Sequence, residues 1–231
     1  MIDDLEEWFL KVRCTLEEAY LHHDEPWKQS GMSGPVERWT SLRKPVADCI
    51  DKSGSFLDIG CANGYLMECC LKWTGDRGIR IIPYGLDISE KLLTLARQRL
   101  PRYAANFFLG NAFTWMPPMQ FDFVRTSLEY VPGEYERQFL SFLLTNHLNP
   151  GGKLLVANYG EGLTIQEIEK GIISGSHPTS DILHRLQKLG FDTVEYNDGF
   201  DPVKSRKIRV AILMTKPRQF ILSAEKPKLP A

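Results

Sequence analysis

The chain has 231 residues, and its 28 Lys and Arg residues nearly balance its 29 Asp and Glu residues, which gives a formal net charge of −1. With 43% hydrophobic and 25% charged residues, its composition is that of an ordinary globular protein and excludes disordered and fibrous classes. The near-neutral net charge gives no sign of the positively charged surface that binds nucleic acid. The length of the chain fits one main domain with an appended segment.

The cysteines and the hydropathy of the chain indicate an intracellular protein. The five cysteines form no C-x-x-C pair, and the neighbours Cys69 and Cys70 are poorly placed to bridge each other. No stretch approaches the ~18 apolar residues of a membrane span, and no signal-peptide pattern opens the chain. The histidines lack metal-ligand spacing. We therefore expect a cytoplasmic protein without a membrane segment or a metal site.

Residues 1–52 are predicted to form an N-terminal helical extension. Apolar side chains recur every three or four residues over 3–22, with acids between them, which predicts an amphipathic helix. A turn-rich stretch follows, and Pro35 stands near the expected first turn of a second helix. Pro45 is expected to start another short helix. The apolar stripe of the first helix requires a partner surface.

From residue 55 on, short apolar runs alternate with helical patterns. The runs that predict strands are 56–59, 79–86, 107–109, 121–127 and 153–157. The segments that predict helices are 65–73, 90–100, 135–148 and 179–190. Such alternation predicts a doubly wound α/β fold, in which crossover helices connect the strands of a mostly parallel sheet.

The C-terminal part has a different pattern. Two closely spaced strand-like runs, 191–196 and 208–214, flank Asn197-Asp198-Gly199, which predicts an antiparallel hairpin at the edge of the sheet. Prolines break the pattern in residues 217–231, which we expect to be a tail. The predicted main domain therefore covers residues 53–216.

Two segments combine into the pattern of a nucleotide-type cofactor site. Residues 56–64 run from an apolar strand through a glycine-bearing turn, and residues 84–89 end a second strand at Asp87. Glycines in such a turn allow positive φ and a close ligand approach, and the helix that follows presents free N–H groups. Because the carboxylate of Asp58 lies beside those amides, the site suits a zwitterion, such as the amino acid end of S-adenosylmethionine, better than a bare pyrophosphate. We expect Asp87 to hold ribose hydroxyls. The alternative is that the glycine turn serves only close packing of the strand against the helix and binds no ligand.

These segments resemble the class I S-adenosylmethionine-dependent methyltransferases. Residues 56–64 resemble the first motif of that family, residues 85–89 its ribose-binding motif, 110–113 its adenine contact, 121–124 its fourth strand and 148–154 the turn into its fifth. Ala62 departs from the pattern because it replaces the middle glycine. The resemblance implies a seven-stranded sheet with a reversed last strand, S-adenosylmethionine as cofactor and S-adenosylhomocysteine as product. The cofactor-binding residues that it implies are Asp58, Gly60, Cys61, Ala62, Asn63, Gly64, Asp87, Ile88, Asn111, Ala112, Thr126 and Ser127.

The acceptor side is predicted from the end of the fourth strand and from the N-terminal extension, which the resemblance implies to fold over the cofactor as a lid. Glu129 and Tyr130 follow that strand, where open α/β sheets place their chemistry, and they are the catalytic candidates for orienting or deprotonating an acceptor. The expected substrate-pocket residues are Tyr20, Trp27, Gln29, Arg38, Trp39, Asn158 and Tyr159. Aromatic walls with a few polar groups are typical of small-ligand pockets, so we expect a small-molecule acceptor.

Three other functions fit the same sequence. An RNA or other nucleic-acid methyltransferase is disfavoured by the near-neutral charge and by the lack of an Asn-Pro-Pro-Tyr sequence or a Pro-Cys nucleophile. An NAD-dependent oxidoreductase shares the glycine turn, but Asp58 fits it poorly and a Tyr-x-x-x-Lys pair is missing. A cofactor-binding regulator without catalysis is the third. The sequence leaves the acceptor atom and the oligomeric state open.

Overall fold

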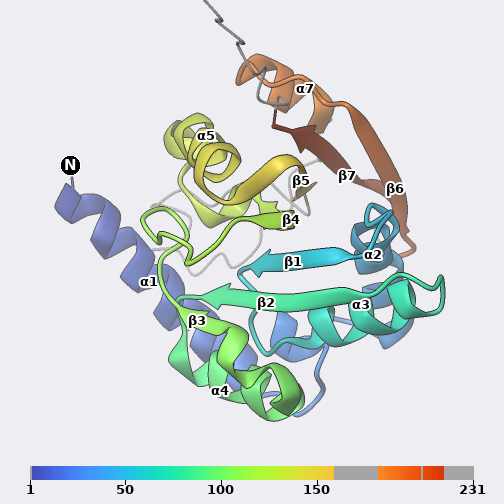
Figure 1. The fold of residues 1–231 in the computed structure, drawn as a ribbon. Coiled ribbons are helices and arrows are strands. Elements are labelled where there is room, and N and C mark those ends of the chain that lie inside the picture. The colour runs from blue at the N-terminus through green and yellow to red at the C-terminus, as the bar shows by residue number, and fades with distance from the viewer. Residues whose placement is uncertain (1, 159–181, 204, 216–231) are drawn as a thin grey trace, which may run out of the picture.

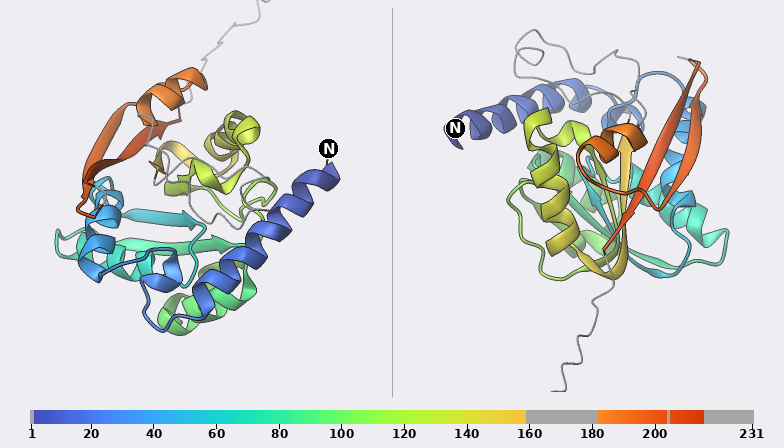
Figure 2. Two further views of the ribbon diagram at one scale, coloured as in Figure 1. Left: turned by 180° about the vertical axis from the view of Figure 1, so that it is seen from behind. Right: turned by 90° about the horizontal axis from the view of Figure 1, so that it is seen from above.

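The computed structural model describes residues 2–158, 182–203 and 205–215, in which a single sheet is flanked by helices on both faces (Figures 1 and 2). The seven strands lie in the order β3-β2-β1-β4-β5-β7-β6. Strands β1 to β5 pair in parallel, whereas β7 runs antiparallel to both β5 and β6. The predicted fold, a mostly parallel sheet with an antiparallel C-terminal hairpin, is confirmed.

The elements follow the predicted alternation closely. The strands are β1 (Gly54–Ile59), β2 (Ile81–Asp87), β3 (Phe107–Leu109), β4 (Phe121–Ser127), β5 (Leu148–Asn158), β6 (Glu195–Asp201) and β7 (Arg206–Met214). The α-helices are α1 (Ile2–Leu21), α2 (Val36–Asp48), α3 (Tyr65–Gly75), α4 (Glu90–Arg99), α5 (Glu136–Asn146) and α7 (Ile182–Lys188). Short 3-10 turns are η1 (Lys28–Ser30), η2 (Pro101–Asn106), η3 (Leu128–Tyr130) and η4 (Gly133–Tyr135).

The central strands are apolar on both faces because helices cover both faces of the sheet. In β1, Phe56 belongs to a buried cluster with residues of α2, α3 and α4, whereas Leu57 belongs to a second cluster with residues of α5 and α7. Both side chains are fully buried. This two-sided core fixes the sheet and leaves the carboxyl ends of its strands as the place for a site.

Helix α1 lies across the carboxyl ends of β1 and β2 (Figure 1). Its Trp8 is only 1% exposed, and its Glu17 accepts a 2.8 Å hydrogen bond from the Ser89 hydroxyl and forms a 2.8 Å ion pair with Lys91. These contacts hold α1 against the start of α4. None of the described helices combines the length and apolar character that crossing a membrane demands.

Helix α2 corrects one prediction, because Pro45 lies inside it and does not start a separate helix. Proline has no N–H, so the carbonyl of Ser41, four residues earlier, has no partner at that place in the helix. Strand β6 packs there through Gly199, where a Cβ atom would lie 2.7 Å from both the Ser41 carbonyl oxygen and the Pro45 ring. The helix thus continues through the proline, and the strand that covers it carries a glycine.

The hairpin also differs in register from the prediction. Asn197, Asp198 and Gly199 do not form its turn but lie within β6, and the chain reverses between Asp201 and Arg206. Asp198 lies opposite Arg209 and binds its guanidinium at 2.6 and 3.1 Å. That ion pair and the packing of Gly199 on α2 outweigh the local turn preference of the Asn-Asp-Gly sequence.

Candidate active site

A cavity of about 250 Å³ is lined by residues at the carboxyl ends of the central strands and by residues of α1. One half is lined by the segments 58–62, 86–89 and 110–112, which follow β1, β2 and β3. The other half is lined by side chains of α1, of residues 30–33, of α2 and of the segment after β4. The two predicted halves of the site, one for a cofactor and one for an acceptor, are therefore continuous.

The turn after β1 is built from residues with positive φ. Gly60 has φ +70° and Gly64 has φ +74°, and Ala62 adopts φ 46°, which is uncommon for a residue with a side chain. The Gly60 and Cys61 amides donate to the Leu86 carbonyl at 2.8 and 3.2 Å. The Ala62 amide donates to the Asp87 carboxylate at 2.8 Å. The alanine in place of the usual glycine is thus held in its conformation by the acid at the end of β2.

Asp87 joins the turn to the next helix. Its second carboxylate oxygen accepts a 2.9 Å hydrogen bond from the Ser89 amide, and the Ser89 side chain caps α4. The carboxyl group is 9% exposed, on the wall of the cavity. Burial raises the pKa of Asp87 to about 6, while its backbone hydrogen bonds oppose the rise. The group is therefore an anion at neutral pH and can accept hydrogen bonds from ligand hydroxyls.

Asp58 is not a lone carboxylate, because it is paired with a buried arginine of β4. Asp58 and Arg125 are register neighbours in β1 and β4, with exposures of 1% and 3%, and Nη1 of Arg125 lies 3.1 Å from the carboxylate. The same nitrogen donates to the Ile59 carbonyl at 3.3 Å and to the Tyr130 hydroxyl at 2.7 Å. Burial raises the pKa of Asp58, and Arg125 opposes the rise. The negative charge expected beside the turn is therefore largely balanced.

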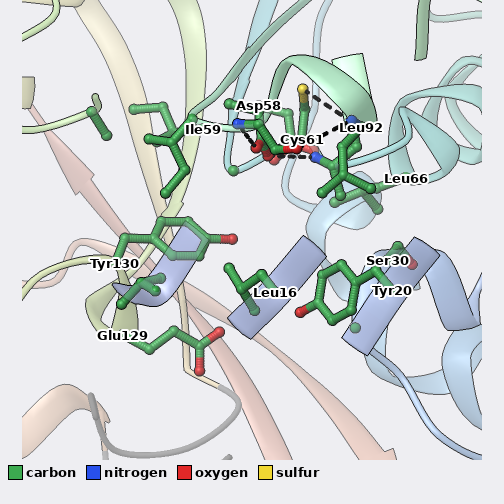
Figure 3. Close-up of a pocket in the computed structure, with 18 of the residues that line it drawn as sticks. Leu16, Tyr20, Ser30, Asp58, Ile59, Cys61, Leu66, Leu92, Glu129 and Tyr130 are labelled. Atoms are coloured by element: carbon green, nitrogen blue, oxygen red, sulfur yellow. Dashed lines mark hydrogen bonds between the residues drawn. The ribbon is translucent and has the colours of Figure 1, made fainter. Parts of the chain in front are cut away.

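Glu129 and Tyr130, the catalytic candidates, both line the cavity. Figure 3 shows the Glu129 carboxylate and the Tyr130 hydroxyl directed into the same space as Leu16 and Tyr20 of α1. The Tyr130 ring lies against Gly60, where a Cβ atom would be 2.6 Å from Cζ of the ring. Burial raises the pKa of Glu129 and raises that of Tyr130 well above its usual range. The phenol is thus a hydrogen-bond donor at all physiological pH values.

The N-terminal residues predicted for the acceptor pocket divide into two groups. Tyr20, Arg38 and Trp39 line the cavity. Trp27 and Gln29 are not among its lining residues and instead support the structure around it. The Trp27 indole donates to the Gly34 carbonyl at 3.0 Å, and the Gln29 side chain accepts a 3.0 Å hydrogen bond from the Asn63 amide group.

Four of the predicted cofactor residues lie beside the cavity rather than on its wall. Asn63 precedes Gly64, the N-cap of α3, and Thr126 and Ser127 are buried at the end of β4. Asn158 ends β5, where it pairs in register with Arg209 of β7. Tyr159 lies outside the described residues. Within the described part of the chain, no group of three or more His, Cys, Asp or Glu residues could hold a metal ion.

Residues 56–152 match a family model described as "Methyltransferase domain". A Burkholderia thailandensis 1,6-didemethyltoxoflavin-N1-methyltransferase, solved with 1,6-didemethyltoxoflavin and S-adenosylhomocysteine, has a similar structure (TM-score 0.63, 13% identity, 92% of this chain and 90% of that chain covered). The fold is that of a class I methyltransferase. The family resemblance seen in the sequence is thereby confirmed over the matched segment.

Two further structures widen the range of proteins that share this methyltransferase fold. One comes from a complex of the Haloferax volcanii Trm112 methyltransferase activator with a methyltransferase (TM-score 0.64, 14% identity, 88% of this chain and 97% of that chain covered). The other is the [4+2]-cyclase SpnF (TM-score 0.59, 15% identity, 90% and 93% covered). No curated protein sequence matches the chain significantly.

Sequence reasoning missed two arginines of the site. Arg125 was visible as a charged residue inside the otherwise apolar run of β4, which signals a buried charge that needs a partner. Arg43 occurs at helical spacing from Trp39 and Val46, so it shares their buried face of α2. In both cases the signal was a charge at a position whose periodicity predicts burial.

The Asp58–Arg125 pair gives a testable stability coupling. Arg125→Leu leaves a buried carboxylate without its counter-ion, so we expect a loss of about 3–5 kcal/mol in the free energy of unfolding. Adding Asp58→Asn removes the orphaned charge and should recover part of this loss, with a coupling energy of about 1–3 kcal/mol. Urea unfolding of the two single variants and the double variant measures the cycle. Strictly additive effects would contradict the pairing.

Proposed function

We propose that the protein is an S-adenosylmethionine-dependent methyltransferase that acts on a small molecule. The observation that carries this proposal is the Asp87 carboxylate, fixed by the Ala62 amide at the end of β2 and facing a cavity that continues beneath α1. The matched family model supports it, as does the similar Burkholderia enzyme, which holds S-adenosylhomocysteine and a small acceptor.

The residues of the first half of the cavity suit this cofactor. The Asp87 carboxylate has two amide donors and retains acceptor capacity on its cavity side, as ribose hydroxyls require. The turn 60–64 approaches the cavity with little side-chain bulk. Ile88, Asn111 and Ala112 line the same half of the cavity, and we assign them to the adenine. Asn63 and Gly64 complete the turn, and Thr126 and Ser127 are buried at the end of β4. When bound, the cofactor supplies a methyl group already activated on a sulfonium.

The protein then has to hold the acceptor, exclude water and manage a proton. Helix α1 covers the cavity through its contact with Ser89 and Lys91, which limits access of water. Tyr20, Arg38 and Trp39 form part of the acceptor wall. Glu129 is the group that accepts a proton and Tyr130 the group that donates a hydrogen bond, while positioning supplies much of the acceleration.

A small acceptor is favoured over a nucleic acid for two reasons. The acceptor half of the cavity lies beneath α1, and the chain has a net charge of −1. The second candidate is a protein whose cavity binds the cofactor but does not transfer its methyl group. The similar fold of a [4+2]-cyclase favours this candidate. A cytoplasmic location stays a prediction, and the Haloferax complex makes an activator protein a partner to test for.

Transfer itself is the first test. The protein is incubated with methyl-labelled S-adenosylmethionine and a cell metabolite extract, and the label is counted in small-molecule and RNA fractions. We expect label in the small-molecule fraction and thermal stabilisation by S-adenosylhomocysteine but not by NAD. Stabilisation by NAD alone would exclude the proposal. Stabilisation by S-adenosylhomocysteine without any transfer would favour the second candidate.

The Asp87 assignment predicts a pH dependence of cofactor binding. Because burial raises the pKa of Asp87 to about 6, protonation below that pH removes the acceptor for ribose hydroxyls. The affinity for S-adenosylhomocysteine should therefore be constant above about pH 7 and fall by up to about tenfold per pH unit below pH 6. Isothermal titration calorimetry between pH 5 and pH 8 measures this fall.

The Asp87→Asn variant should bind S-adenosylhomocysteine about 1–3 kcal/mol more weakly at pH 7.5 and lose the pH dependence. Asp76→Asn, at an exposed carboxylate just after α3, is the matched control and should behave like the wild-type protein. An Asp87→Asn protein with wild-type affinity and pH dependence would refute the ribose assignment.

A further inference from the structure

We propose that the acceptor is a flat cyclic amide, whose ring nitrogen faces Glu129 and receives the methyl group while its carbonyl oxygen accepts hydrogen bonds from Tyr20 and Tyr130. The inference rests on the proposed methyl transfer in this cavity and deepens it by naming the class of acceptor. It follows from the hydrogen-bonding groups that these three side chains present to the cavity.

Two tyrosines from different elements are fixed with their hydroxyls towards one space. Tyr20 belongs to α1 and Tyr130 to η3, and both line the cavity together with Glu129. Figure 3 shows the two hydroxyls and the carboxylate directed into the same space. Each tyrosine ring lies against a glycine with positive φ. A Cβ atom on Gly31 would overlap the Tyr20 hydroxyl, and one on Gly60 would collide with the Tyr130 ring, so the backbone makes room for both phenols.

Both phenols are hydrogen-bond donors towards the cavity. The Tyr130 oxygen already accepts a 2.7 Å hydrogen bond from Nη1 of Arg125, so its own proton is available for another acceptor. Within the described part of the chain, the Tyr20 hydroxyl forms no hydrogen bond. Burial raises the pKa of both hydroxyls well above the usual range, so neither loses its proton near neutral pH.

Glu129 supplies the complementary acceptor. An ionised carboxylate has about four lone-pair sites and no proton to donate. Burial raises the pKa of Glu129, which makes its carboxylate a better proton acceptor near neutral pH. The three side chains thus present two donors beside one basic acceptor. A ligand that fits them offers oxygen lone pairs next to a proton that it can give up.

This arrangement distinguishes between classes of acceptor. A single hydroxyl has one oxygen for all three partners, so the two phenols would occupy the lone pairs with which it has to attack. An alkylamine is protonated at neutral pH and offers the phenols no acceptor. A cyclic amide separates the two roles, because its nitrogen carries the proton and its adjacent carbonyl oxygen accepts from the phenols. It therefore leaves none of the three buried groups unpaired.

The walls of the cavity favour a flat ring. Leu16 of α1 and the side chains of Trp39 and Leu42 of α2 line the cavity beside the polar groups. Trp39 is fully buried, and its ring centroid lies 4.6 Å from that of Tyr65. Its indole N–H donates to the Ser30 hydroxyl at 2.8 Å, so the ring is held in one orientation. Rigid aromatic and aliphatic walls bind flat rings well.

The transfer step balances with the groups present. The Glu129 carboxylate takes the proton of the ring N–H, and the negative charge that develops is shared with the carbonyl oxygen, where the Tyr20 and Tyr130 hydroxyls stabilise it. The ring nitrogen bonds to the methyl carbon while the carbon–sulfur bond breaks and leaves its electron pair on sulfur. Glu129 afterwards releases its proton to water. Because the phenols occupy the oxygen lone pairs, the methyl group goes to nitrogen rather than to oxygen.

Two pairs of probes, each pair differing in a single ring position, test this inference by binding alone. The protein saturated with S-adenosylhomocysteine is titrated calorimetrically at pH 7.5 with 2-quinolone and coumarin, and with the smaller 2-pyridone and 2-pyranone. In each pair the lactone replaces the ring N–H of the amide by an oxygen, whose lone pairs would face the Glu129 carboxylate. We expect the amide that fits better to bind about tenfold or more tightly than its lactone.

Glu129→Gln and Tyr20→Phe separate the two kinds of contact. Glutamine can turn its amide to donate to a lactone oxygen, so the Glu129→Gln variant should lose most of the preference for the cyclic amide. Tyr20→Phe should weaken the amide and the lactone alike by about fivefold, because both carry the carbonyl. The matched controls are Glu134→Gln, at an exposed position of η4, and Tyr103→Phe in η2, which should bind as the wild type does.

The outcomes separate this inference from the proposed function. Absence of S-adenosylhomocysteine binding in the wild-type protein would contradict the proposed function. With normal S-adenosylhomocysteine binding, the acceptor assignment would be overturned by equal binding of amide and lactone, by binding of neither amide, or by a product from the metabolite extract that is methylated on a hydroxyl, a thiol or an alkylamine. An undiminished preference for the amide in a folded Glu129→Gln variant would also overturn it.

Discussion

The hydrogen bond from the Ala62 amide to the Asp87 carboxylate connects the two parts of the crevice on which the rest of the site depends. It holds the positive-φ turn after β1 against the end of β2. The other oxygen of Asp87 binds the Ser89 amide, and the Ser89 side chain both caps α4 and donates to Glu17. A single buried carboxylate thus determines the shape of the turn, the start of a helix and the position of the helix that covers the cavity.

The electrostatics of the cavity follow from buried charges that come from different elements. Asp58 is balanced by Arg125 across β1 and β4, so the turn does not present a bare anion. Arg38 is balanced by Asp201 between α2 and β6. Glu129 and Arg43 both line the cavity, and the charge of Arg43 opposes the rise in the pKa of Glu129 that burial causes. The second half of the cavity therefore combines a proton acceptor with a cation, whereas the first half offers Asp87 to neutral hydroxyl groups.

The sequence predicted the elements that depend on local signals, namely the strand–turn–helix around 56–64 and the acid at the end of β2. The reversed last strand followed from the family resemblance. The prediction from the sequence was wrong where tertiary contacts determine the local structure. The Asn-Asp-Gly sequence of 197–199 prefers a turn, yet packing against α2 and the pair with Arg209 keep it in a strand. The role of Arg125 depends on Asp58 in a neighbouring strand, which one sequence without its fold does not pair with it.

The central claim is that the methyl donor and the acceptor bind in two halves of one cavity. A crystal structure of the protein with S-adenosylhomocysteine tests this claim most directly. We predict both ribose hydroxyls within hydrogen-bond distance of the Asp87 carboxylate, with the thioether sulfur open to the half that Arg43 and Glu129 line. Binding with the ribose away from Asp87, or with the sulfur directed away from Glu129, would contradict the account.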